Sequence, residues 1–224
     1  MSKSYLFVIA HPDDEVLGAG ATMYELAKAG NDVYVCCLSC ECDTRVDELL
    51  EAMKKTHKML GVKDSFVGSY RCLCFKDEPH HEMVQFVEHA IRESKADVVF
   101  THHPTDLNND HYITSIICQE AVRLPQRLIG YDKKIENVLF MEVPSETDWH
   151  LNSAWDSFKQ NTYFNVSVNA VRAKIKALEV YDYVVRATPH PRSRRNLKAL
   201  AALRGSECGY ENAEAFQSIF KIGV

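Results

Sequence analysis

The sequence predicts a three-layer α/β domain in which helices cover both faces of a mostly parallel sheet. Short apolar runs rich in valine, tyrosine and cysteine alternate with segments whose apolar residues recur at helical spacing. Near-continuous apolar runs are typical of parallel strands buried on both faces. Alternation of such strands with helices indicates a parallel sheet, so we expect one Rossmann-like domain over residues 1–224 with an active site at the carboxyl edge of the sheet.

The first expected strand covers residues 5–10 and stops at Pro12, which lacks the N–H that a strand interior needs. A helix over residues 16–29 follows, and Gly30-Asn31 forms a turn. Further strands are expected at residues 32–39, 65–68, 97–101, 137–144 and 163–168. Further helices are expected at residues 45–60, 82–95, 112–123, 169–185 and 196–204, with an irregular segment at residues 70–81.

Composition limits the classes of function. The chain has 224 residues, of which 46% are hydrophobic and 25% charged, enough for a full core. Its net charge of −5 indicates no basic surface for nucleic acid, and no apolar run approaches the roughly 20 residues needed to span a bilayer. The start of the chain fits a first strand better than a signal peptide, because acids follow the apolar run at once.

Cysteine usage favours a cytoplasmic protein with reduced thiols. Most of the eight cysteines lie in apolar, strand-like contexts, where cysteine behaves as a small hydrophobic residue. Cys40 and Cys42, and Cys72 and Cys74, are spaced as Cys-x-Cys. Structural zinc sites use Cys-x-x-Cys, so the pattern argues against a cysteine zinc site.

An imidazole and three carboxylates stand directly after the first expected strand, in the segment His11-Pro12-Asp13-Asp14-Glu15. Ligands bind at this edge in open α/β sheets. His11 and Asp14 offer a nitrogen and an oxygen ligand that suit zinc, although iron or cobalt could use them too. Asp13 could take a proton from a metal-bound water. The alternative is a turn in which Asp13 or Asp14 caps the next helix.

Residues 10–15 read Ala-His-Pro-Asp-Asp-Glu. This segment resembles the opening motif of the PIG-L (LmbE-like) family of zinc-dependent N-acetyl-sugar deacetylases and matches it at every position. The resemblance implies a second, distant motif that ends in Asp-His and closes the metal site.

A second polar cluster at residues 102–111 also follows an expected strand and ends in Asp110-His111. His111 would complete a His-Asp-His ligand set with His11 and Asp14 and leave a position open for water, as in catalytic zinc sites. Asp110 could cap the following helix or orient a ligand.

The family often has a histidine where this chain has Asn108, which removes an imidazole from that position. Asn108 could still donate a hydrogen bond to a developing oxyanion. His102 and His103 fit a polar loop with satisfied imidazoles as well as a chemical role.

Two further residues are candidates for binding substrate. Arg45 follows the second expected strand, and the family has an arginine at the substrate side there; the alternative is a surface arginine at a helix start. His190, between Pro189 and Pro191, is a candidate proton donor and substrate contact, or part of a rigid loop. Residues 204–216 also resemble the family's C-terminal sequence.

The motifs together predict an enzyme that uses Zn²⁺ to remove the N-acetyl group from an amino sugar or its conjugate. His11, Asp14 and His111 would hold the metal, Asp13 would act as general base, and Asn108 would stabilise the oxyanion. Two alternatives remain: a metal-dependent amidase for a non-sugar amide, and a homologue that binds metal or sugar without turnover. The expected partner is a small amino-sugar substrate, with no nucleic acid or membrane span, and a homo-oligomer is possible.

Overall fold

The computed structural model describes residues 2–40, 45–131, 133–150 and 157–223 of the chain. In this part of the chain seven strands form one sheet in the order β3-β2-β1-β4-β5-β7-β6. The strands are β1 (Ser4–Ile9), β2 (Asp32–Cys37), β3 (Asp64–Val67), β4 (Val98–His102), β5 (Asn137–Met141), β6 (Thr162–Asn165) and β7 (Ala213–Lys221). Strands β1 to β5 are parallel, and β7 is antiparallel to both β5 and β6. The expected mostly parallel sheet is confirmed.

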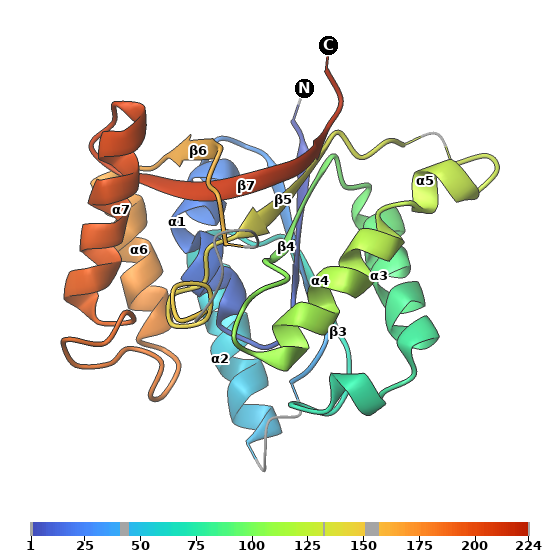
Figure 1. Cartoon of the computed structure of the whole chain (residues 1–224), viewed down its shortest axis with the longest axis horizontal. Helices are drawn as coiled ribbons and strands as arrows, with labels where there is room; N and C mark the ends of the chain where they lie inside the picture. The colour runs from blue at the N-terminus through green and yellow to red at the C-terminus, as the bar shows by residue number, and fades with distance from the viewer. Residues whose placement is uncertain (1, 41–44, 132, 151–156, 224) are drawn as a thin grey trace.

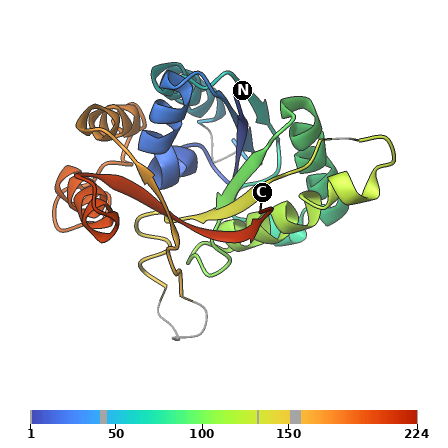
Figure 2. The same ribbon diagram turned by 90° about the horizontal axis from the view of Figure 1, so that it is seen from above.

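Helices cover both faces of this sheet, which gives three layers (Figures 1 and 2). One face carries α1 (Asp14–Lys28), α2 (Val46–Leu60), α6 (Val168–Leu178) and α7 (Arg194–Cys208). The other face carries α3 (His80–Ser94) and α4 (Asn109–Ala121), with the short helices η1 (Phe75–Asp77) and α5 (Leu124–Arg127) beside them. The three-layer α/β architecture expected from the sequence is therefore present.

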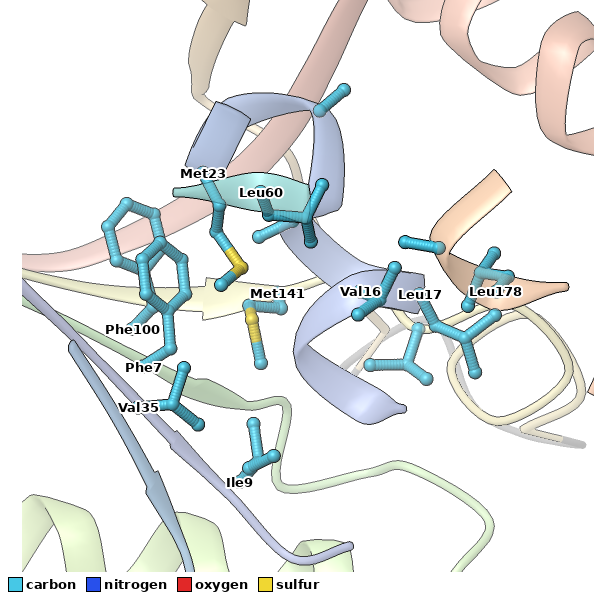
Figure 3. Packing of buried hydrophobic residues seen from close by; sticks show 14 of the residues in the cluster. Phe7, Ile9, Val16, Leu17, Met23, Val35, Leu60, Phe100, Met141 and Leu178 are labelled. Carbon is cyan, nitrogen blue, oxygen red and sulfur yellow. The ribbon is translucent and has the colours of Figure 1, made fainter. Parts of the chain in front are cut away.

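Strand β1 shows why a buried parallel strand reads as one apolar run. Phe7 and Ile9 point into the core under α1, while Leu6 and Val8 point to the opposite face under α3 and α4. All four side chains are fully buried. On the α1 side the rings of Phe7 and Phe100 stack with centroids 4.5 Å apart (Figure 3). Burial of each such side chain stabilises the fold by about 1.5–3 kcal/mol.

Several helix boundaries differ from expectation, among them the end of α7 at Cys208 and not at residue 204, and two of the differences have identifiable reasons. Helix α4 begins at Asn109, three residues early, because Oδ1 of Asn108 accepts a hydrogen bond from Asp110 N at 2.9 Å and caps the helix. Helix α6 ends at Leu178 and not at residue 185. The apolar residues that suggested a longer helix, including Tyr181 and Val184, pack into the core from a turn.

Strand β7 was not expected, because a carboxylate lies inside it. Glu214 is 6% exposed and accepts a hydrogen bond from Lys174 Nζ at 2.6 Å. It also accepts hydrogen bonds from the backbone N–H groups of Ala21 and Thr22 in α1. A buried charge is tolerated only when it is paired in this way. The pairing depends on residues far apart in the chain, which local sequence patterns do not reveal.

The described cysteines are free thiols, and Cys36, Cys37 and Cys40 are buried as their strand contexts suggested. Cys42 lies outside the described residues. Among the described helices, none combines the length and apolar character that crossing a bilayer requires.

Candidate active site

The candidate site lies at the carboxyl ends of β1 and β4, which are parallel neighbours in the centre of the sheet. The chain leaves β1 toward β2 on one side and leaves β4 toward β5 on the other, so this is the topological switch point where open α/β sheets bind ligands. His11 and Asp14 follow β1, and His111 lies in the first turn of α4. Each of these three residues offers one ligand atom, and the three atoms lie within 4.8 Å of one another.

Asp14 stands between the two imidazoles. Its Oδ2 lies 3.6 Å from Nδ1 of His11, and its Oδ1 lies 3.3 Å from Nε2 of His111. The carboxylate is held in place because Oδ2 accepts a hydrogen bond from His11 N at 2.9 Å. The fold therefore brings together the three residues that the sequence suggested as metal ligands.

A carboxylate lies behind each imidazole. Nε2 of His11 lies 3.0 Å from Asp110 Oδ2, and Nδ1 of His111 lies 3.0 Å from Asp106 Oδ2. Such carboxylates fix the tautomer of ligating histidines, here leaving His11 Nδ1 and His111 Nε2 to face Asp14. Of the two interpretations of Asp110, the geometry supports orientation, since Asn108 provides the cap. Asp106 was missed by sequence reasoning.

The balance of charge favours a cation. Burial raises the pKa of Asp14, but the charges of His111 and His102 and their hydrogen bonds outweigh it and hold the pKa well below its usual range. Burial lowers the pKa of His111, but Asp14 and Asp106 outweigh it and raise the pKa to about 9. A surplus of carboxylates thus attracts positive charge, which protons or a metal ion can provide. The nitrogen and oxygen donors fit a divalent ion such as zinc.

The interpretation of His102 and His103 as satisfied loop imidazoles is wrong for His102, which ends β4 and whose buried Nδ1 makes no hydrogen bond within the described residues, lying 3.5 Å from Asp106 Oδ2. Nε2 of His102 accepts a hydrogen bond from Ala10 N at 3.0 Å, and its ring stacks on His111. Nδ1 of His103 lies 2.7 Å from Thr105 Oγ1. His102, Asp106 and His111 also offer ligand atoms within 4.8 Å. His102 and Asp106 do not line the cleft over the site, so substrate would not reach an ion held among them.

A cleft of about 230 Å³ opens over His11, Asp14 and His111. Asp13, Arg45 and Asn108, which the sequence suggested as site residues, line it. His190 does not; its ring packs edge-to-face on Trp149, and its neighbour Arg192 lines the cleft instead. The remaining lining residues are Pro12, Leu49, Glu146, Tyr181, Asp182 and Val184.

Asp13 lines the cleft, and its carboxylate does not cap the helix that follows it. It precedes α1, but its side chain makes no cap hydrogen bond, which argues against the capping interpretation. Its backbone has φ 103°, in the left-handed region. Burial raises the pKa of Asp13 well above its usual range, the charge of Asp14 adds to this, and Arg192 opposes it.

A buried chain of hydrogen bonds supports the backbone of Asp13. Oε2 of Glu15 accepts a hydrogen bond from Asp13 N at 3.2 Å, and its Oε1 lies 2.9 Å from Nε2 of His57. Nδ1 of His57 lies 2.8 Å from Ser65 Oγ. The sequence motif included Glu15, but it did not reveal His57 and Ser65, the partners that α2 and β3 contribute.

Arg192 was also missed, although it follows the Pro-His-Pro segment that drew attention to His190. Its guanidinium donates to Glu146 Oε1 at 2.9 Å and to Ser145 Oγ at 2.7 Å. Sequence reasoning selected the imidazole of this segment because histidine titrates near neutral pH. The structure brings the guanidinium to the cleft.

A family model described as GlcNAc-PI de-N-acetylase (PIG-L) matches residues 6–122, which is more than half of the chain. The chain belongs to the PIG-L family. The resemblance of the two motifs is thereby confirmed, and the chain is an enzyme of a family of amide hydrolases. A search of curated proteins found no match.

Solved structures share the fold of this PIG-L protein. N,N′-Diacetylchitobiose deacetylase from Pyrococcus horikoshii is 19% identical, with a TM-score of 0.77 over 97% of this chain and 84% of that chain. The conserved protein TT1542 from Thermus thermophilus is 20% identical, with a TM-score of 0.78 over 99% and 97%. GalB, the 4-carboxy-2-hydroxymuconate hydratase from Pseudomonas putida, is 20% identical, with a TM-score of 0.76 over 99% and 98%. Because one of these is a hydratase, the fold alone does not fix the reaction.

Proposed function

We propose that this PIG-L protein is a zinc-dependent deacetylase that cleaves the acetamide of an amino sugar or its conjugate, acting as one domain over residues 1–224. The observation that carries the proposal is the grouping of His11, Asp14 and His111 within 4.8 Å beneath a cleft that Asp13 also lines. A base beside a metal site has a purpose in hydrolysis and none in simple binding. The deacetylase activity of the chitobiose relative supports a sugar substrate.

His11, Asp14 and His111 would hold the zinc ion, whose Lewis acidity polarises the acetyl carbonyl and lowers the pKa of water toward about 7. Asp13 takes the proton at its carboxylate as water attacks the carbonyl carbon, and then returns it to the leaving nitrogen. Bond cleavage thus yields acetate and a free amine. Asp13 is suited to this role because its carboxylate lines the cleft and is not tied to the start of α1.

Asn108 would donate a hydrogen bond to the developing oxyanion. Its Oδ1 accepts from Asp110 N, and a backbone N–H can only donate, so the identity of that side-chain oxygen is fixed. The NH₂ group is therefore the part of the amide that remains to face a ligand in the cleft. A donor held by a helix cap is preorganised, as oxyanion stabilisation requires.

Replacing Asn108 tests this role. Asn108→Ser keeps a good helix cap but removes the amide donor, so we expect kcat to fall by about 10²-fold with little change in KM. Asn108→Ala removes the donor and the cap, so it should show the same kcat and lose about 0.5–2 kcal/mol of stability. Steady-state kinetics and thermal unfolding separate the two effects. Normal kcat in Asn108→Ser would exclude an oxyanion role.

Arg45 would bind the polar substrate. It is exposed and lines the cleft, where a guanidinium can bond hydroxyl or phosphate groups. A hydrogen bond from a charged donor is worth about 1.5–3 kcal/mol, so Arg45→Ala should lower kcat/KM roughly 10- to 100-fold at unchanged metal content. Arg92→Ala, an exposed arginine on α3, is the control and should change neither. Equal kcat/KM values in the two variants would remove Arg45 from the binding site.

A cytoplasmic location fits this proposal. Seven cysteines are described and all are free thiols, whereas disulfides form and persist in oxidising compartments.

The experiment that tests the function is a panel of N-acetylated compounds assayed for acetate and free amine. It should contain free, nucleotide-linked and lipid-linked N-acetylglucosamine, a thiol conjugate, and acetamides without a sugar. Zinc-dependent release of acetate from one of the sugars is the expected result. Release only from the non-sugar acetamides would support the alternative amidase. Release from none by the zinc-loaded protein would contradict the proposal and favour a protein that binds without turnover.

A further inference from the structure

The imidazole of His11 has a carboxylate on each side. Nδ1 faces Asp14 Oδ2 at 3.6 Å, and Nε2 faces Asp110 Oδ2 at 3.0 Å. The Nδ1 side belongs to the candidate zinc site. The Nε2 side faces a second group of metal-ligating side chains, which the proposed reaction does not use as ligands.

Cys72 completes this second group. His11, Cys72 and Asp110 each offer one ligand atom, and the three atoms lie within 4.8 Å of one another. The thiol of Cys72 is hydrogen-bonded to His11. Asp110 also accepts hydrogen bonds from the backbone N–H groups of Leu73 at 2.6 Å and Phe75 at 3.3 Å. These bonds hold the segment that carries Cys72 against the carboxylate.

The three donors form a set that suits one class of ion. A thiolate, an imidazole nitrogen and a carboxylate oxygen are ligands for zinc, cobalt and other thiophilic divalent cations. Zn–N and Zn–O bonds of about 2.0–2.2 Å at a tetrahedral angle leave two ligands of one ion roughly 3.3–3.6 Å apart. The separation of His11 Nε2 and Asp110 Oδ2, 3.0 Å, is a little shorter than this, so the pair would have to open slightly to admit an ion. An ion could thus replace the proton between them with small shifts of the side chains.

We propose that His11, Cys72 and Asp110 form a second, weaker site for a thiophilic divalent cation. Binding releases one proton from the Cys72 thiol and one from His11 Nε2, and the ion then bonds to sulfur, nitrogen and carboxylate oxygen. The second ion removes the hydrogen bond by which Asp110 orients His11. Occupying both sites removes both N–H protons from one imidazole, which explains why the second ion would bind more weakly.

This inference rests on the proposed function only in assigning His11 to the first site, and its test needs no substrate. Protein carrying one equivalent of zinc is freed of excess metal and titrated with Co²⁺. We expect one equivalent of cobalt to bind with zinc retained, and a thiolate-to-cobalt charge-transfer band to appear in the near ultraviolet. The band should be lost in Cys72→Ser and in Cys72→Ala. It should persist in Cys74→Ser, a matched variant of the same segment whose cysteine is also partly buried.

Zinc content and circular dichroism establish that each variant is folded and carries the first ion. A charge-transfer band of undiminished intensity in folded Cys72→Ser would assign the thiolate to another cysteine and overturn the proposal. Absence of the band in the wild-type protein at saturating cobalt would overturn it as well. Neither result depends on acetate release, so failure of the second site and failure of the proposed function are distinguishable.

Discussion

Asp13→Asn is expected to keep the metal and the fold and to lower kcat by about 10²-fold or more. The amide has nearly the shape of the carboxylate but cannot accept the proton of the attacking water, and general-base catalysis contributes about 10²–10⁴-fold. Asparagine is the right replacement, because Asp13 has φ 103° and asparagine tolerates the left-handed region better than most residues. Alanine there would add backbone strain to the loss of the base.

The measurement is kcat at saturating substrate, together with zinc content and the melting temperature of the same preparation. Asp47→Asn, at an exposed position in the first turn of α2 that does not line the cleft, makes the same chemical change and should leave kcat unchanged. Near-normal kcat in zinc-loaded Asp13→Asn would show that Asp13 is not the base, and Glu146, the other carboxylate beside Arg192 in the cleft, would be the next candidate.

The fold and the central grouping of the site could be predicted from the sequence, because both follow from local patterns and one geometric rule. Apolar runs indicated the parallel strands, and the carboxyl ends of neighbouring parallel strands lie at the same edge. That rule allows Asp14 and His111 to lie near each other although 97 positions separate them in the sequence (111 − 14), and the resemblance to the PIG-L motifs indicated His111 as the third ligand. Whether the two motifs actually meet depends on which strands are neighbours in the sheet. The sheet order places β1 beside β4.

The supporting residues could not be predicted, because each is defined by a contact between distant segments. His57 lies on an amphipathic helix and reads as an ordinary helical residue until its ring meets Glu15. Asp106 lies in the loop after β4, which positions its carboxylate behind His111. The hydroxyl of Thr147, from a distant segment, also donates a hydrogen bond to Asp106 at 2.7 Å. Strand β7 was not predicted for the same reason. It contains the buried carboxylate of Glu214, and the partner that stabilises this charge is the distant Lys174 on α6.

His111→Ala is expected to reduce the metal content from about one equivalent to nearly none. The variant removes one of three protein ligands and leaves Asp14 and Asp106 facing a gap, so part of its lower stability will come from buried carboxylates without a partner. Elemental analysis of chelator-free protein measures the loss. His89→Ala, which replaces an exposed histidine on α3, should retain the full equivalent.

Stability measured with and without chelator distinguishes lost binding from damaged packing. An ion that binds only the folded state stabilises it by RT ln(1 + [M]/Kd), or about 2.7 kcal/mol when the free ion is at 100 times its Kd. Chelation should therefore lower the melting temperature of the wild-type protein and of His89→Ala, but not that of His111→Ala. A full equivalent of metal in His111→Ala would contradict the proposed ligand set.

His11→Ala then decides which group of ligands holds the ion. His111 belongs both to the cleft set with His11 and Asp14 and to the enclosed set with His102 and Asp106, so its loss empties either. His11 belongs only to the first of these two. We expect His11→Ala to lose the metal as His111→Ala does. Retention in His11→Ala with loss in His111→Ala would place the ion behind the cleft wall, where it could support the fold but could not polarise a substrate.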